Sequence, residues 1–183
     1  MAFQRAKQRE PVGEAGLFEY AVGALSRRMR TVRDLRRLMK VRAHPGEDGE
    51  RDMDRVVERL IELKYLSDER FAEDFTRVRK EGRALGRRRV AQDLAVKGVD
   101  KELAATALES AYGEANEVEL ARAYCAKKRI PQPADQKETV RLMNRLMRAG
   151  YGSSAIFKLL RSWNVETPEV STDSDQYGEM PEF

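Results

Sequence analysis

Apolar residues recur three and four positions apart along almost the whole chain, and this spacing constrains the fold more than any other feature. One stripe contains Leu17, Ala21 and Leu25, and another contains Val56 and Leu60. Such spacing places the apolar side chains on one face of a helix with 3.6 residues per turn. No stretch alternates apolar and polar residues as a half-buried strand would. The pattern predicts an all-α protein of about eight or nine short helices.

Three triplets of residues spaced by four indicate an internal repeat. In each triplet the first residue is small or carries a hydroxyl, which suits the turn into a helix, and the next two place apolar groups on one face. The triplets are Thr31, Leu35 and Met39; Gly86, Val90 and Leu94; and Gly152, Ile156 and Leu160. We interpret them as marking three helical clusters in tandem, which would form an elongated, curved array because each cluster mainly contacts its neighbours.

Helix-start and helix-stop residues set the expected boundaries of these units. Ser67, which precedes two acidic residues, is a good helix N-cap, and Pro131 cannot continue a helix. The segment after Val165 contains six acidic residues and no Lys or Arg, so we expect it to be disordered. The expected organisation is a flexible N-terminus at 1–16, a first unit at 17–66, a second at 67–130, a third at 131–165 and an acidic tail at 166–183.

Charge is unevenly distributed between the body of the chain and its C-terminal segment. The chain has 35 Lys and Arg residues against 31 Asp and Glu, and because six of the acids follow Val165, the remainder is strongly basic. A basic body indicates a polyanionic partner, since Lys and Arg release counterions from phosphates when they bind. The competing interpretation, in which long basic side chains only solvate helix faces, stays open.

Two dense groups of basic residues are the candidates for binding such a partner. Arg87, Arg88 and Arg89 occupy the first turn of an expected helix, where the helix dipole disfavours cations. A bound phosphate or carboxylate would explain them, because guanidinium groups and helix N-termini both attract anions. The expected concave binding face comprises Arg77, Lys80, Arg83, Arg87, Arg88, Arg89 and Lys97, and a secondary group comprises Arg30, Arg33, Arg36, Arg37 and Lys40.

The sequence contains no recognisable catalytic or metal-binding constellation. One Cys and one His are too few for a zinc or iron–sulfur site, and no Gly-rich phosphate loop or nucleophile elbow is present. We expect Cys125 and Trp163 to pack in the core and His44 to lie in a turn. No apolar run approaches the ~20 residues that a membrane span needs. We therefore expect a cytoplasmic protein without enzymatic activity, metal or cofactor.

The centre of the chain carries an ordered set of motifs. YLSDERFA at 65–72 is followed by Arg77, by GRRRV at 86–90 and by KGVD at 97–100. In this order of aromatic, acidic, basic and Gly positions, the chain resembles the RecX family of bacterial regulatory proteins. The resemblance extends over roughly residues 18–163. The chain departs from the family pattern in an acidic loop at Glu47 to Asp52 and in its acidic tail.

The resemblance implies an elongated, curved array of three tandem three-helix units without enzymatic activity. It also implies a regulatory role, mainly inhibition of the RecA recombinase, through binding to RecA–DNA filaments and suppression of ATP hydrolysis and strand exchange in recombination and DNA repair. Weak, non-specific binding to single- and double-stranded DNA and a monomeric state are expected. Two alternatives remain: a helical module that binds DNA or RNA directly without RecA, and a helical adaptor for an acidic protein.

Overall fold

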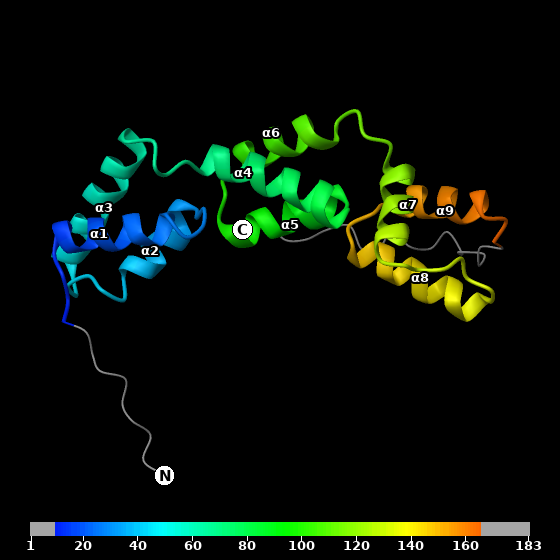
Figure 1. Cartoon of the computed structure of the whole chain (residues 1–183), viewed down its shortest axis with the longest axis horizontal. Coiled ribbons are helices and arrows are strands. Elements are labelled where there is room, and N and C mark those ends of the chain that lie inside the picture. Colours follow the sequence, from blue (N-terminus) through cyan, green and yellow to red (C-terminus); the bar gives the residue numbers. More distant parts are fainter. Residues whose placement is uncertain (1–9, 166–183) are drawn as a thin grey trace, which may run out of the picture.

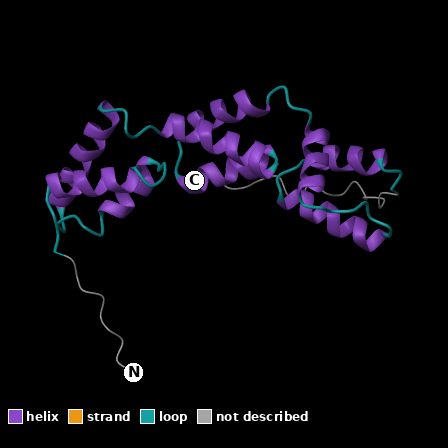
Figure 2. Ribbon diagram, viewed as in Figure 1, coloured by secondary structure: helices purple, strands orange, loops and turns teal. Residues whose placement is uncertain are grey.

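The computed structural model describes residues 10–165, and within that range it contains helices, loops and one isolated bridge between Val12 and Ala43 (Figure 2). The helices are α1 (Glu14–Leu25), α2 (Val32–Met39), α3 (Glu47–Glu62), α4 (Asp68–Arg77), a π-helical turn η1 (Val78–Gly82), α5 (Arg87–Lys97), α6 (Lys101–Tyr112), α7 (Glu117–Lys127), α8 (Gln136–Arg148) and α9 (Ser153–Ser162). None of these described helices is long and apolar enough to cross a membrane. The predicted all-α class is confirmed.

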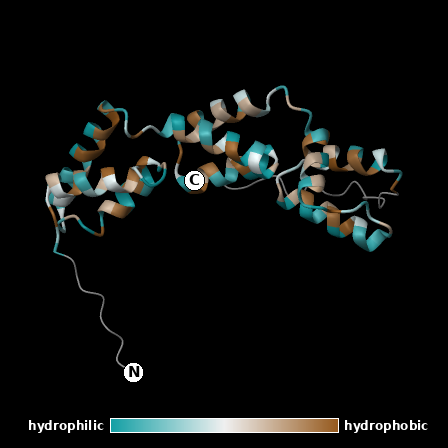
Figure 3. Cartoon of the chain, viewed as in Figure 1, coloured by the Kyte–Doolittle hydropathy of each residue, from teal (hydrophilic) through white to brown (hydrophobic). Residues whose placement is uncertain are grey.

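The helices form three groups of three that follow one another along the long axis of the molecule (Figure 1). Each group has its own cluster of buried apolar side chains, and hydrophobic segments of the ribbon occur in all three groups (Figure 3). These clusters are built from residues such as Leu17, Leu35 and Leu60 in α1–α3, Phe71, Val90 and Leu94 in α4–α6, and Leu146, Ile156 and Leu159 in α7–α9. The predicted elongated array of three-helix units is confirmed, and each unit has its own core.

Two of the expected boundaries differ from the units that the packing of the helices defines. Ala121 and Tyr124 of α7 are buried against α8 and α9, so the third unit begins at α7 and the predicted boundary at 130–131 falls inside it. The N-terminal segment expected to be flexible, 1–16, overlaps α1, which begins at Glu14. Residues 1–9 and the predicted acidic tail, 166–183, lie outside the described residues.

The predicted repeat holds for two units and is shifted in the third. Thr31 and Gly86 are the N-caps of α2 and α5, the second helix of each unit. Gly152 is also an N-cap, but it begins α9, the third helix of its unit. A feature that all three units share is a glycine with positive φ before the third helix, at Gly46, Gly98 and Gly150. Glycine is favoured there because a Cβ strains this backbone conformation.

The segment from Glu47 to Asp52, expected to be an acidic loop, forms the first turns of α3. Its carboxylates are favourable at that position, because the N-terminal end of a helix carries a partial positive charge. Glu50 also forms ion pairs with Arg36 of α2 at 3.0 Å and with Lys40 at 3.3 Å. The acidic residues therefore stabilise a helix and bind the neighbouring basic helix within the first unit.

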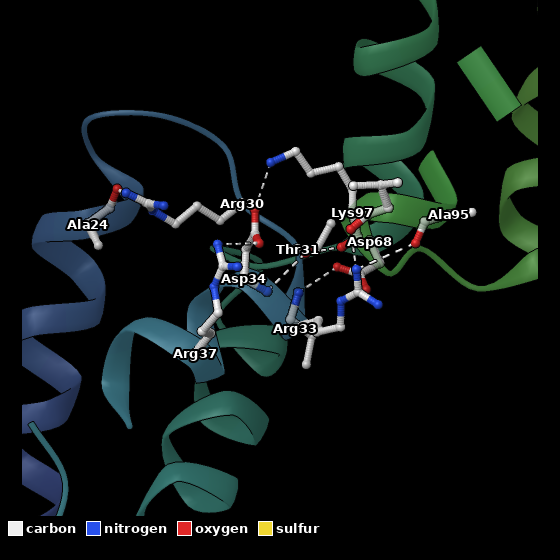
Figure 4. A network of polar contacts seen from close by, with 11 residues as sticks. Ala24, Arg30, Thr31, Arg33, Asp34, Arg37, Asp68, Ala95 and Lys97 are labelled. Atoms are coloured by element: carbon white, nitrogen blue, oxygen red, sulfur yellow. Dashed lines mark hydrogen bonds and ion pairs between the residues drawn. The ribbon is translucent and has the colours of Figure 1, made fainter. Parts of the chain in front are cut away.

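The joint between the first and second units is polar (Figure 4). The Thr31 hydroxyl donates a hydrogen bond to the Lys97 carbonyl oxygen at 2.8 Å, and the Val32 N–H donates to the Asp68 carboxylate at 2.8 Å. The Lys97 ammonium lies 3.0 Å from the Asp34 carboxylate. These contacts place the N-terminus of α2 against the C-terminus of α5.

The joint between the second and third units repeats this head-to-tail arrangement but adds apolar contacts, because Leu85 and Leu120 pack against both cores. The Gly86 N–H, at the start of α5, donates a hydrogen bond to the Ala149 carbonyl oxygen at the end of α8, at 2.8 Å. The Tyr151 hydroxyl, buried in the third core, hydrogen bonds to the carbonyl oxygens of Ala84 and Leu120. Burial raises the pKa of Tyr151, so the hydroxyl stays protonated and can donate.

We predict that Thr31→Ala lowers the free energy of unfolding by about 1–2 kcal/mol. The Thr31 side chain is fully buried, accepts a hydrogen bond from the Asp34 N–H at 3.1 Å and donates to the Lys97 carbonyl. Alanine removes the helix cap and leaves the partly buried Lys97 carbonyl without that donor. Urea unfolding of the full chain measures the effect. Thr31→Ser keeps the hydroxyl and should lose less than half as much; an equal loss in both variants would contradict this assignment.

Candidate anion-binding site

The predicted binding face does not form one surface, because the helix distributes its residues around the axis. Successive residues of an α-helix point about 100° apart. Arg87 accordingly turns toward α6, where it forms an ion pair with Glu109 at 2.9 Å. Arg88 lines a hollow beside Glu117, and Arg89 forms an ion pair with Asp93 at 3.0 Å. Arg87 and Arg88 therefore line one hollow, whereas Arg89 faces another part of the surface.

Arg77 and Lys80 lie next to α6 within the second unit. Arg77 is exposed and forms an ion pair with Asp74 at 2.5 Å, a contact that raises the pKa of its guanidinium. The Lys80 ammonium donates to the Ala111 carbonyl oxygen and lies 5.4 Å from the centre of the Tyr112 ring. Both cations line a shallow hollow apart from the other predicted residues. Lys80 already has partners within the chain.

The basic first turn of α5 has a partner that sequence reasoning missed. The C-terminus of α8 lies against it, with Ala149 and Gly150 next to Gly86. The C-terminal end of a helix carries a partial negative charge. The α8 carbonyl groups therefore offset part of the charge on the three arginines. This contact explains part of their position without an external anion, and their role in anion binding stays a prediction.

Lys97 and the secondary basic group are largely occupied by contacts within the chain. Lys97 pairs with Asp34, and Arg33 donates to the carbonyl oxygens of Ala95 and Val96.

Other members of the secondary group form contacts within the first unit. Arg36 pairs with Glu50 and Asp54. Arg37, which is highly exposed, lies 3.5 Å from Asp34, and Lys40 pairs with Glu50. Arg30 lies apart, in a hollow near the start of α4. Most of this group stabilises the first unit and its joint to the second.

A hollow lined by many cations lies where the second and third units meet. We call this hollow of about 510 Å³ the junction pocket. Six cations line it, together with Asp93, the apolar residues Leu85 and Ala149, and Tyr124. The cations are Arg79, Arg83, Arg89, Lys128, Arg145 and Arg148. Only Arg83 and Arg89 belong to the predicted face, so the structure relocates the candidate site toward the third unit.

The electrostatics of the junction pocket favour a polyanion. Asp93, the carboxylate in its wall, is already shared by Arg89 at 3.0 Å and Arg79 at 3.6 Å. Within the described residues, Arg83, Lys128, Arg145 and Arg148 have no carboxylate within ion-pair distance. Guanidinium groups bind phosphates and carboxylates with two parallel hydrogen bonds. The pocket can therefore accept the phosphates of a nucleic acid or an acidic protein segment.

The third-unit cations could have been noticed in the sequence, although their convergence could not. Lys127, Lys128 and Arg129 form a basic run, and Arg145 and Arg148 lie three residues apart on one helix face. Their proximity to Arg79 and Arg83 depends on the joint between two units. The π-turn η1 contributes as well, because it carries Arg79 with its guanidinium over the Phe75 ring, 4.7 Å from the ring centre.

The three residues that we expect to have structural roles lie where the sequence predicts them. Cys125 is buried, and this burial raises the pKa of its thiol. Trp163 packs against the third core, and His44 lies exposed between α2 and α3. Within residues 10–165, no group of three or more His, Cys, Asp and Glu side chains is arranged to hold a metal ion.

Comparison with known proteins identifies relatives along most of the chain. Residues 67–108 match the family profile described as RecX, second three-helix domain. The chain is 30% identical over 142 residues to the "Regulatory protein RecX" of Trichlorobacter lovleyi, covering 76% of this chain and 90% of the relative. It is 31% identical over 173 residues to that of Streptomyces coelicolor, covering 93% of this chain and 87% of the relative.

Two solved structures share the fold. The crystal structure of RecX from Lactobacillus salivarius superposes with a TM-score of 0.63 at 18% identity, covering 82% of this chain and 96% of that one. A second, titled as a crystal structure of regulatory protein RecX, superposes with a TM-score of 0.66 at 20% identity, covering 81% and 71% of the two chains. Sequence identity over most of both chains and a matching fold together place this chain in the RecX family of regulatory proteins.

Proposed function

We propose that this protein modulates, mainly by inhibition, the RecA recombinase. It would bind RecA–DNA filaments and suppress ATP hydrolysis and strand exchange in recombination and DNA repair. Binding to single- and double-stranded DNA alone would be weak and independent of sequence. Membership of a family of regulatory proteins supports a role in control rather than in catalysis.

The junction pocket is the observation that carries this proposal. It presents four cations that no described carboxylate neutralises, from two different units of the chain. A protein filament on DNA offers phosphates and acidic protein surface together, and long-range attraction steers a basic surface toward both. The elongated row of units supports simultaneous contacts with more than one filament subunit (Figure 1), and linked weak contacts give strong overall binding.

The proposal is tested by the single-strand-dependent ATP hydrolysis of RecA from the same organism. The full chain should inhibit hydrolysis at well below one molecule per RecA. The variant Arg145→Ala/Arg148→Ala should need several times more protein for the same inhibition, because it removes two cations of the junction pocket that have no carboxylate partner among residues 10–165.

A control variant distinguishes the effect of the junction pocket on inhibition from the effect of net charge. Arg51→Ala/Arg55→Ala removes the same charge from exposed positions of α3, where Asp48 and Glu14 already pair with those arginines. It should inhibit RecA as the unmodified chain does. Absence of inhibition at equimolar protein, on a filament shown to be active, would refute RecA modulation and favour a module that binds nucleic acid directly.

A further inference from the structure

A second hollow lies between the first and second units and shares no residue with the junction pocket. It has a volume of about 260 Å³, and we call it the Tyr65 pocket. Tyr65, which begins the YLSDERFA motif, lies in the linker between α3 and α4. The pocket is lined by Leu25, Met29, Arg30, Lys64, Tyr65, Ser67, Arg70 and Asp74. The RecA-directed role of the basic residues leaves this aromatic side chain unexplained.

The Tyr65 ring is exposed on a fixed backbone. Its residue is 61% exposed, and among the described residues no ring–ring contact, cation–ring contact or side-chain hydrogen bond involves it. The Tyr65 N–H donates to the Leu60 carbonyl oxygen at 2.9 Å, which closes the end of α3. Met29, also half exposed, forms part of the same wall. The backbone of Tyr65 is therefore fixed, while its ring remains open to a ligand.

Three cations line the Tyr65 pocket and form no ion pair within the described residues. Arg30 is anchored by its Nε–H to the Ala24 carbonyl oxygen at 3.4 Å, and Arg70 by a terminal N–H to the Lys64 carbonyl oxygen at 3.4 Å. None of the three, Arg30, Lys64 or Arg70, forms an ion pair within the described part of the chain. Asp74, the carboxylate of the pocket wall, pairs with Arg77 instead.

The electrostatics of Arg30 leave room for a further negative charge, although Asp34 partly offsets the neighbouring cations. Burial lowers the pKa of the Arg30 guanidinium, and the nearby cation of Arg28 lowers it further. A negative charge beside Arg30 would relieve this repulsion. Of the ligands that combine an anion with an apolar face, a nucleotide within a strand matches best, because its base stacks on an aromatic ring while its phosphates contact cations on both sides.

We propose that the Tyr65 pocket binds one nucleotide of single-stranded DNA, with its base stacked on the Tyr65 ring and its neighbouring phosphates on Arg30 and Arg70. The inference rests on the proposed DNA contact and adds to it a preference for unpaired bases. A duplex cannot use this site, since its bases are stacked on each other and expose no face to the ring. The junction pocket, in contrast, can contact the phosphates of both single-stranded and double-stranded DNA.

The test compares strands that differ only in their bases. The full chain is titrated into a fluorescently labelled oligothymidylate and into an abasic strand of equal length and charge, and binding is followed by anisotropy. The unmodified chain should bind the strand with bases about fivefold or more tightly. Tyr65→Ala should abolish this difference, while Tyr65→Phe and Tyr65→Trp should retain it. Because the side chain is exposed, all three variants should unfold at the same temperature as the unmodified chain.

Two further measurements distinguish stacking from other contacts. In Tyr65→Trp, oligothymidylate should quench the indole fluorescence more than it quenches that of Trp163 in the unmodified chain, and the abasic strand should not. Tyr65→Leu keeps apolar area without an aromatic face and should behave like Tyr65→Ala. If Tyr65→Leu binds like the unmodified chain, or if Tyr65→Ala keeps the preference for bases, stacking at this site is refuted.

Failure of this inference and failure of the proposed DNA contact give different results, and RecA modulation is tested separately by ATP hydrolysis. Equal affinity of the unmodified chain for both strands, with weaker binding of both by Arg145→Ala/Arg148→Ala, overturns the base site and leaves the phosphate contact intact. No binding to either strand at low salt overturns the direct DNA contact itself, and the base site with it.

Discussion

Replacing Arg145 and Arg148 together with alanine should weaken binding to DNA by at least about tenfold at 0.1 M salt, and should do so for any sequence. Both side chains line the junction pocket, and neither has a carboxylate partner among the described residues. Each phosphate contact releases about one counterion, so the slope of log affinity against log salt should fall by about two units. Anisotropy titrations of a labelled duplex from 50 to 200 mM salt measure both quantities.

The comparison variant Arg51→Ala/Arg55→Ala loses the same formal charge from α3. Its arginines are paired with Asp48 and Glu14 and lie in the first unit, so we expect its affinity to stay within about twofold and its salt slope to stay unchanged. Equal weakening in the two variants would mean that net charge alone controls binding and that the junction pocket has no special role.

The fold was predictable because its determinants are local in the sequence. Ser67 caps α4 by accepting a hydrogen bond from the Arg70 N–H, and Asp100 caps α6 by accepting from the N–H groups of Glu102 and Leu103. Gly98 ends α5 in the left-handed conformation. Such caps and the apolar spacing act over a few residues, so they can be recognised without knowledge of tertiary contacts.

The unit boundaries were harder to predict because the strongest break in the sequence lies inside a unit. Pro131 and Pro133 interrupt the chain between α7 and α8, which both belong to the third core. The actual passage between units, after α6, contains Gly113 and the N-cap Asn116 and no proline. Proline prevents helix continuation, but it does not indicate which helices pack together.

The candidate site was only partly predictable because it depends on a contact between units. Arg83 and Arg89 are recognisable from the local density of basic residues, whereas Arg145 and Arg148 reach the same hollow only because the C-terminus of α8 meets the N-terminus of α5. The same contact partly explains the arginines in the first turn of α5. Sequence spacing reports which residues share a helix face, and it carries no information on which helix ends meet.

The glycine at this meeting point gives the second prediction with a large expected effect: Gly150→Ala should lower the free energy of unfolding by roughly 3 kcal/mol. Gly150 has a φ of 94°. An added Cβ would lie 2.4 Å from the Arg89 backbone nitrogen and 2.8 Å from the Gly86 carbonyl oxygen. Both atoms belong to the backbone at the start of α5, so neither can move away without separating the two units.

Urea unfolding followed by the fluorescence of Trp163, which packs against the third core, measures this loss, and Gly23→Ala is the matched control. Gly23 lies inside α1, and an added Cβ there meets no atom within 4 Å. Alanine should therefore stabilise that helix by about 0.5–1 kcal/mol. The free energy of unfolding should fall in Gly150→Ala and rise in Gly23→Ala. Gly150 permits the close approach of α8 to α5, whereas Gly23 only weakens its helix. If Gly150→Ala unfolds at the same urea concentration as the unmodified chain, the close backbone contact between the second and third units is not what holds them together.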